Sequence, residues 1–195
     1  MGEMPAIARS KENTMALDER YYVKAKEKLL YSDGNLINES GVVADIVSGK
    51  YKQVNITVDG VQRSLYSHKV VWYIFNGDIP EFVDHINRNS MDNTICNLRP
   101  ANKYQNALNR MPLRGRFKGV YYNKGIGKFH AQCNSLDKRH IGFFDDELEA
   151  AVEYDRKLLD HLSDSDIVFA YLNSIGGCLP DLKDIEELKL TLIGE

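Results

Sequence analysis

The sequence "VDHINRNSMDNTICNLRPANKYQNALNR", residues 83–110, begins at the end of an apolar, strand-like run and finishes in a helix-like segment. Asp84 and His85 stand side by side where the strand-like run ends, and asparagines recur through the rest. A turn through residues 86–98 would bring Asn106, on the helix-like segment, back beside them. The stretch therefore predicts a polar site built from a strand, a turn and a helix.

The side chains of this site suit the hydrolysis of a phosphodiester. One carboxylate from Asp84 and one carboxamide oxygen from Asn106 make a sparse set of hard ligands, which favours Mg²⁺ or Mn²⁺ with waters and a phosphate over zinc. A histidine has an ordinary pKa near ~6.5, so His85 can be neutral and take a proton from an attacking water. A divalent metal, a base and a phosphate predict a metal-dependent phosphodiesterase.

The residues "VDHINRN…DNTICNLRPANKYQN" resemble the His-Asn-His (HNH) endonucleases, particularly the phage and intron-homing branch, over roughly residues 51–110. That branch carries Asp-His first, Asn-Leu-Arg in the middle and Asn last. The resemblance implies a ββα-metal fold in which Asp84 and Asn106 bind the metal and His85 is the general base. It also implies that Asn97 pins the loop and helps to orient His85 through the backbone. Asn106 stands where the name-giving pattern has its last His, as is usual in this branch.

Other residues near the site have plainer explanations. Asn87, Asn89 and Asn93 fit turn positions, because asparagine tolerates the left-handed conformation. His68 begins a predicted buried helix and fits a capping or packing residue better than a second base. Cys96 fits a small apolar filler.

Charge is segregated along the chain, although the net charge is only −3. Between Arg99 and His140 the charged residues are basic except for Asp137, whereas acids dominate from Asp145 onward. A basic block predicts a polyanion partner, although both blocks could also be solvated faces. The residues that we expect to contact double-stranded DNA are Arg99, Arg110, Arg114, Arg116, Lys118, Tyr121, Asn123, Lys124, Gln132, Asn134, Lys138 and His140.

Strand-like segments "GVYYN", "KFHAQCN" and "KRHIGFF", followed by the helix-like "DELEAAVEYDRKLLDHL", resemble the plant ethylene-response-factor (apetala-two) DNA-binding domain over about residues 115–174. The resemblance implies a three-stranded antiparallel sheet that enters the major groove, with the helix behind it. Independently, alternation along the strands predicts one face toward the helix and one open face. The residues expected to face the helix are Val120, Phe129, Ala131, Cys133, Ile141 and Phe143.

This sequence departs from the plant pattern on the open face. Lys118, Tyr121, Asn123 and Asn134 replace arginines, and the tryptophans of the binding face are absent. A bidentate Arg–guanine contact contributes ~1–3 kcal/mol of discrimination, so the sheet is expected to read bases poorly.

The whole chain is expected to be α+β. The predicted nuclease domain, with its β-hairpins at "YSDGNLI" and "YKQVNITVDGVQRSLY" and a helix closed by Gly77, precedes a three-stranded antiparallel sheet packed on one helix. The expected divisions are a tail at 1–17, the nuclease domain at 18–110, a linker at 111–116, the DNA-binding domain at 117–175 and an acidic tail at 176–195.

Several classes of protein are excluded. Within the 195 residues no apolar run reaches the roughly 18 residues of a membrane span, and no signal peptide is visible. Three dispersed cysteines argue against disulfides or structural zinc, which favours a reducing cytoplasm, the host's if the protein is phage-encoded. The sequence has no sustained heptad repeat of the kind that would indicate a coiled-coil dimer, so a monomer is expected. No small-molecule cofactor is expected.

The sequence therefore predicts a metal-dependent DNA endonuclease of the free-standing, phage homing type that nicks duplex DNA. The alternative is a DNA-binding regulator whose nuclease site has decayed, although the intact set of site residues argues against decay. RNA cleavage or binding is a third possibility, disfavoured because few exposed aromatic residues are expected on the sheet for stacking single strands.

Overall fold

The computed structural model describes residues 19–113, 115–134, 136, 139–176 and 182–193, and the chain divides into two compact units. The first unit runs to His85 and also includes Asn89–Pro100. The second includes Ile86–Arg88 and continues from Ala101. The expected tail at 1–17 lies outside the described residues, and the domain limits expected from the sequence stay a prediction.

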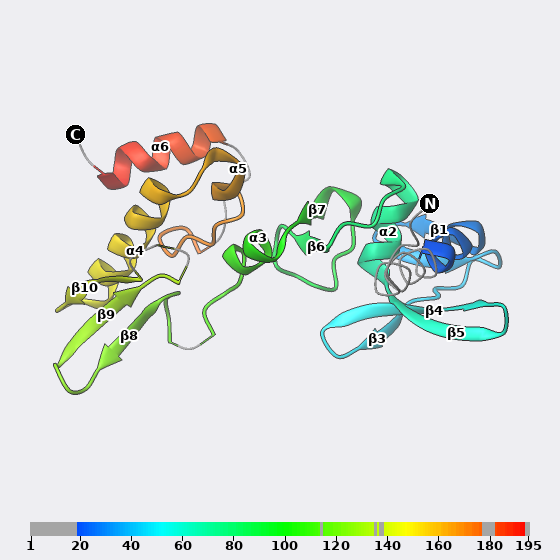
Figure 1. Cartoon of the computed structure of the whole chain (residues 1–195), viewed down its shortest axis with the longest axis horizontal. Helices are drawn as coiled ribbons and strands as arrows, with labels where there is room; N and C mark the ends of the chain where they lie inside the picture. Colours follow the sequence, from blue (N-terminus) through cyan, green and yellow to red (C-terminus); the bar gives the residue numbers. More distant parts are fainter. Residues whose placement is uncertain (1–18, 114, 135, 137–138, 177–181, 194–195) are drawn as a thin grey trace, which may run out of the picture. The chain divides into compact units, whose positions relative to one another are not determined.

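In the described part of the first unit, small sheets are combined with a helix at residues 19–28 and with α2 (Ser67–Asn76) (Figure 1). A helix covers residues 19–28, the first described residues of the chain. The elements that follow are β1 (Leu29–Ser32), β2 (Asn35–Asn38), β3 (Ile46–Ser48), β4 (Tyr51–Val58), β5 (Val61–Tyr66), α2 (Ser67–Asn76), β6 (Phe82–His85), a 3-10 turn (Ile95–Asn97) and β7 (Leu98–Ala101). The sheet orders are β1–β2, β3–β4–β5 and β6–β7.

Both predicted hairpins are confirmed, and their Asp-Gly turns explain them. Asp33 and Gly34 have φ of 45° and 78°, and Asp59 and Gly60 have φ of 50° and 77°. Two successive positive φ angles are what a two-residue hairpin turn requires. The predicted helix α2 also ends as expected, at Gly77, whose φ is 77° and whose N–H donates to the Tyr73 carbonyl.

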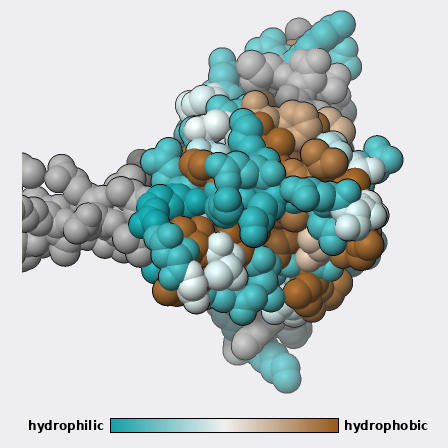
Figure 2. Space-filling model, turned by 90° about the vertical axis from the view of Figure 1, so that its right-hand side faces the viewer, coloured by the Kyte–Doolittle hydropathy of each residue, from teal (hydrophilic) through white to brown (hydrophobic). Residues whose placement is uncertain are grey.

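The core of the first unit lies among the 19–28 helix, the hairpins and α2. Its buried members are Tyr21, Tyr22, Ala25, Leu29, Leu36, Val54, Ile56, Val70, Val71, Tyr73, Val83 and Leu98. Val83 and Leu98 belong to β6 and β7, so this core anchors the strands that carry the candidate site. Figure 2 faces the side of this unit and shows hydrophobic groups at the surface among hydrophilic ones.

The second unit contains one three-stranded antiparallel sheet and several helices. Its elements are α3 (Lys103–Leu108), β8 (Val120–Asn123), β9 (Lys128–Gln132), β10 (His140–Phe144), α4 (Glu147–His161), α5 (Asp164–Ile167) and α6 (Leu182–Ile193). The sheet order is β10–β9–β8, and α4 packs against its strands, so the predicted sheet on one helix is confirmed (Figure 1). These elements are consistent with the expected α+β class. None of the helices in the described ranges is long and apolar enough to cross a membrane.

The faces of this sheet differ from the prediction at two residues. Phe143 was expected to face the helix, but a bulge between His140 and Gly142 interrupts the alternation, and Phe143 lies on the open face beside His130. Phe144 packs against the core in its place. Lys118 was expected on the open face, but its Nζ donates to the carbonyl oxygens of Ala107 and Leu108 at the end of α3.

We predict that Gly119→Ala destabilises the second unit much more than Gly127→Ala. Both glycines have φ of +74°, so alanine costs about 1–2 kcal/mol of strain at either. A Cβ at Gly119 would also collide with the Gln132 carbonyl oxygen and the Tyr154 ring of α4, whereas the nearest atom at Gly127 is 3.9 Å away. Overpacking adds about 1–3 kcal/mol. Urea unfolding monitored by circular dichroism measures both variants, and equal losses would contradict the packing of α4 against β8.

Candidate active site

Asp84 and His85 lie in β6 of the first unit, and both are buried with 6% of their surface exposed. Burying an ionisable side chain is unfavourable unless it has a partner. Each of the two has one, and the partners come from the segment that follows β6 in the chain.

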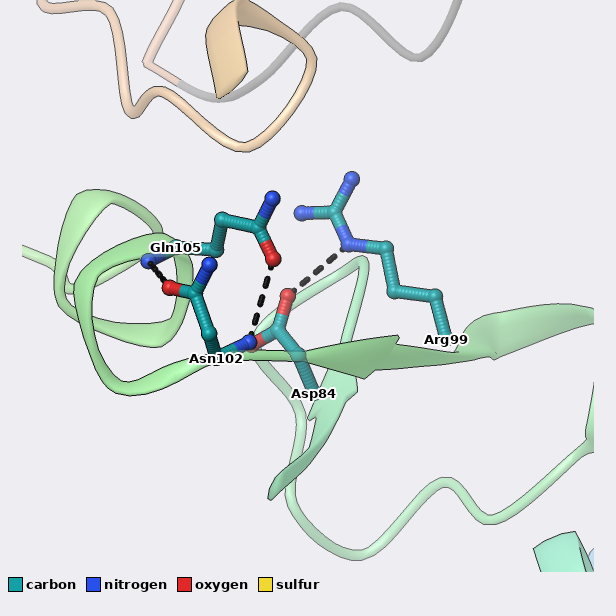
Figure 3. A network of polar contacts seen from close by, with 4 residues as sticks. All are labelled: Asp84, Arg99, Asn102 and Gln105. Atoms are coloured by element: carbon teal, nitrogen blue, oxygen red, sulfur yellow. Dashed lines mark hydrogen bonds and ion pairs between the residues drawn. The ribbon is translucent and has the colours of Figure 1, made fainter. Parts of the chain in front are cut away.

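Asp84 is paired with Arg99 on the neighbouring strand β7. Arg99 Nε donates to Asp84 Oδ2 at 2.9 Å, and the two side chains are only 13% and 7% exposed (Figure 3). Arg99 was expected to contact DNA, but in the structure its guanidinium balances the site carboxylate. The β6–β7 pairing places these charges together.

His85 is held by Asn93, which the sequence analysis assigned to a turn rather than to the site. His85 Nε2 and Asn93 Oδ1 are 2.9 Å apart in a buried hydrogen bond, and Asn93 is 1% exposed. Among the described residues, Asn93 Nδ2 has no hydrogen-bond partner, so His85 satisfies the oxygen of this buried carboxamide but not its NH2 group. The expectation that Asn93 is a turn former is therefore wrong, and Asn93 fixes the orientation of the imidazole.

The side chain of Asn97 binds the backbone of the same loop. Its Nδ2 donates to the Asp92 carbonyl oxygen at 2.8 Å, next to Asn93. The Asp92 carboxylate in turn accepts hydrogen bonds from the N–H and hydroxyl of Thr94. These contacts give the loop one conformation, and so hold Asn93 against His85. The catalytic role expected for Asn97 stays a proposal.

A cluster of aromatic rings, formed by His68, Tyr51 and Tyr66, lies beside His85. The His68 ring of α2 is 5.0 Å from that of His85 in an edge-on arrangement, and Tyr51 and Tyr66 lie 5.4 Å and 5.5 Å from His68. Burial, followed by the charge of His85 and that of Lys69, lowers the pKa of His68 to about 3. His68 is therefore neutral at physiological pH, as fits the packing residue that we expected.

Asn106, the expected second metal ligand, lies on α3 in the second unit. The helix begins with a capping box, in which Asn102 Oδ1 accepts from the Gln105 N–H and Gln105 Oε1 accepts from the Asn102 N–H (Figure 3). Gln105 Nε2 also donates to Asp166 at 3.0 Å, and the Tyr171 N–H donates to the Leu108 carbonyl, so α3 is fixed within its unit. The pairing of Asn106 with Asp84, and the ββα arrangement it needs, stay predictions.

Asp84 supplies one carboxylate at this end of β6, and Arg99 is bonded to it. Within the described ranges no three or more His, Cys, Asp or Glu side chains gather as a metal cluster. A single carboxylate supplemented by amide oxygens and water is the environment in which Mg²⁺ or Mn²⁺ is commonly held. Because Arg99 binds the same carboxylate, a cation at Asp84 competes with a guanidinium already in place.

The residues expected to bind DNA do not form one set in the structure. Arg114 and Lys138 lie outside the described residues. The exposed members are Arg110, Arg116, Tyr121, Lys124, Asn134 and His140, and the half-buried members are Arg99, Lys118, Asn123 and Gln132. Lys118 and Arg99 already bind protein groups, so the exposed members are the better candidates for contacting phosphates.

Comparison with known proteins supports a nuclease. Residues 65–108 match the family model of HNH endonuclease. This short part of the chain includes α2, β6, β7 and α3, and therefore all four of the residues Asp84, His85, Asn97 and Asn106. Comparison with curated proteins and with solved structures gave no match.

We predict that Asn93→Ala slows plasmid cleavage, because the imidazole of His85 loses the group that orients it. One buried hydrogen bond is worth about 1–3 kcal/mol, and a loss of that size in the transition state corresponds to roughly a 5-fold to 150-fold decrease in rate. Asn89→Ala is the matched control, because Asn89 is exposed and its side chain accepts a local hydrogen bond from the Met91 N–H. Equal rates for the two variants at equal folded fraction would contradict this role of Asn93.

Proposed function

We propose that the protein is a metal-dependent endonuclease that hydrolyses phosphodiester bonds of duplex DNA. The observation that carries the proposal is the buried Asp84–His85 pair, which lies inside the segment matched by the HNH endonuclease family model and has its own partner for each side chain. A pair of this kind would be costly to bury in a protein that had no use for it.

His85 is the proposed general base. Its imidazole takes the proton from the water that attacks phosphorus, and Asn93 holds the ring in one orientation while this happens. Asn97 supports this arrangement through the Asp92 carbonyl oxygen. His68 and Tyr51 surround the ring and limit the entry of further water.

Asp84 and Asn106 are the proposed ligands of Mg²⁺ or Mn²⁺. A bound divalent ion supplies charge stabilisation for the phosphate as negative charge develops on it. Asp84 contributes the charged ligand and Asn106 a neutral oxygen. Arg99 balances the Asp84 carboxylate, and a guanidinium is also a group that could bind a phosphate oxygen.

The exposed basic residues of the second unit are proposed to bind the phosphates of the DNA. Arg110, Arg116, Lys124 and Arg139 are exposed there, and the described residues 115–134, 136, 139 and 140 include no acidic side chain. Phosphate contacts of this kind give affinity that falls steeply with salt. The resemblances to phage and homing enzymes and to the plant DNA-binding domain support a free-standing, homing-type nuclease.

We predict that the full chain converts supercoiled plasmid to open circles with Mg²⁺ or Mn²⁺ and not with EDTA. Linear product should follow late, because the chain carries one Asp84–His85 pair and a second strand needs a second encounter. His85→Ala should lose cleavage by about a hundredfold or more, as for removal of a general base. It should keep DNA binding, while Asp84→Ala and Asn106→Ala should raise the metal concentration required.

The matched control is His161→Ala, which removes an exposed histidine at the end of α4 and should cleave like the unaltered chain. Full activity of His85→Ala would contradict the proposed mechanism. Linear product without an open-circle stage at low enzyme would contradict nicking by a monomer.

A further inference from the structure

The open face of the second-unit sheet carries a row of rings that crosses all three strands. Tyr121 of β8 lies directly opposite His130 of β9, and His130 lies opposite Phe143 of β10. The ring centroids are 4.8 Å apart for Tyr121 and His130, and 4.7 Å apart for His130 and Phe143. The bulge in β10 adds His140 to the row, with its Nδ1 2.7 Å from His130 Nε2.

The fold does not need this row for its core. The core of the sheet lies on the other face, where Phe117, Val120, Ala131, Ala150 and Ala151 are buried. Tyr121 and Phe143 are instead 44% and 40% exposed. Burial, followed by the neighbouring His140, lowers the pKa of His130, which disfavours a charge on the ring at the centre of the row. Exposed aromatic rings lined up across a sheet are a surface on which planar groups can stack.

The groups around the row favour a polyanion. Lys124 lies in the turn between β8 and β9, and Arg139 precedes β10; both are exposed. Lys128 lies opposite Asn123 in the register of β8 and β9. The nearest acid along the described chain, Asp145, is bonded to Lys128 at 3.0 Å. Cations flanking stacked rings are the combination that binds single-stranded nucleic acid, because every base has a π-face and each nucleotide carries a phosphate.

Paired DNA does not suit the rings equally well. In a duplex the faces of the bases are covered by their neighbours, and only their edges are offered to a protein in the grooves. The row supplies ring surface rather than the bidentate arginines that read those edges. The expectation that the sheet would carry few exposed aromatic residues is wrong. The sequence-based argument against binding unpaired nucleotides therefore no longer holds.

We propose that the open face of β8–β9–β10 binds single-stranded DNA by stacking unpaired bases on Tyr121 and Phe143, with Lys124 and Arg139 against the phosphates. The proposal rests on the proposed function only in taking DNA as the natural ligand. It gives the second unit a preference for unpaired strands, such as those next to a nick or in a displaced loop.

Fluorescence anisotropy of the full chain in EDTA tests this without cleavage. The probes are labelled oligo-dT of about 12 nucleotides, an abasic oligomer of equal length and charge, and a duplex of the same length. The unaltered chain should bind oligo-dT about tenfold or more tightly than either of the others. Tyr121→Ala and Phe143→Ala should each weaken oligo-dT binding by about 5-fold to 100-fold, since stacking contributes ~1–3 kcal/mol per base, and leave abasic binding unchanged.

Tyr122→Ala is the matched control, because Tyr122 is also exposed on β8 but its ring contacts Phe129 and takes no part in the row. It should bind like the unaltered chain, and Phe143→Tyr, which keeps a ring, should too. Equal binding of oligo-dT and the abasic oligomer would overturn the proposal, as would unchanged binding by Tyr121→Ala and Phe143→Ala. An oligo-U that binds about tenfold more tightly than oligo-dT would overturn the assignment to DNA. Because no step needs metal or hydrolysis, these results are independent of whether His85 is the general base.

Discussion

Two polar side chains can end a buried strand only if each finds a partner, and this requirement organises the first unit around Asp84 and His85. Arg99 meets the carboxylate and Asn93 meets the imidazole, at 2.9 Å in both cases. Removing one member of a buried ion pair typically costs about 3–5 kcal/mol, because the remaining charge is left without compensation. The strands β6 and β7 and the loop between them are therefore constrained by the same contacts that arrange the chemistry.

The constraint also explains the use of asparagine in the loop. A carboxamide can donate and accept, so Asn97 can bond a backbone carbonyl while Asn93 bonds a ring nitrogen. Behind the loop, the first-unit core holds Val83 and Leu98, one on each strand, so the apolar packing positions the strands that present Asp84 and Arg99. The rings of Tyr51, Tyr66 and His68 complete the surroundings of the imidazole, and the lowered pKa of His68, about 3, keeps the His68 ring neutral at physiological pH.

Local patterns predicted much of this fold from the sequence. The Asp-Gly turns specify their hairpins through two positive φ angles, and Gly77 ends α2 for the same local reason. Alternation predicted the sheet of the second unit, because strands have a period of two residues. The matched segment at 65–108 likewise contains the site residues expected from their order in the chain.

Other features depended on contacts distant in sequence or on breaks in a pattern. In the sequence Asn93 looks like the exposed Asn87 and Asn89. Its burial and its hydrogen bond to His85 depend on the folded position of His85. Phe143 departs from alternation because a bulge precedes it, and a bulge leaves no clear sign in a short strand. Lys118 was predicted to lie on the open face, but in the structure its ammonium group donates to a carbonyl oxygen at the end of α3. Tertiary contacts place Asn93 and Lys118, whereas the bulge places Phe143 in the row of rings on the open face.

The central claim is that Asp84 holds the divalent ion of a hydrolytic site, and direct metal binding tests it without cleavage. Binding of Mn²⁺ to the full chain, free of DNA, is measured by titration with water-proton relaxation for the unaltered protein and for Asp84→Asn, which keeps the shape and removes the charge. Saturable binding by the unaltered chain, lost in Asp84→Asn while the variant stays folded, is the predicted result. Equally tight Mn²⁺ binding by Asp84→Asn would contradict the assignment of Asp84 as the metal ligand.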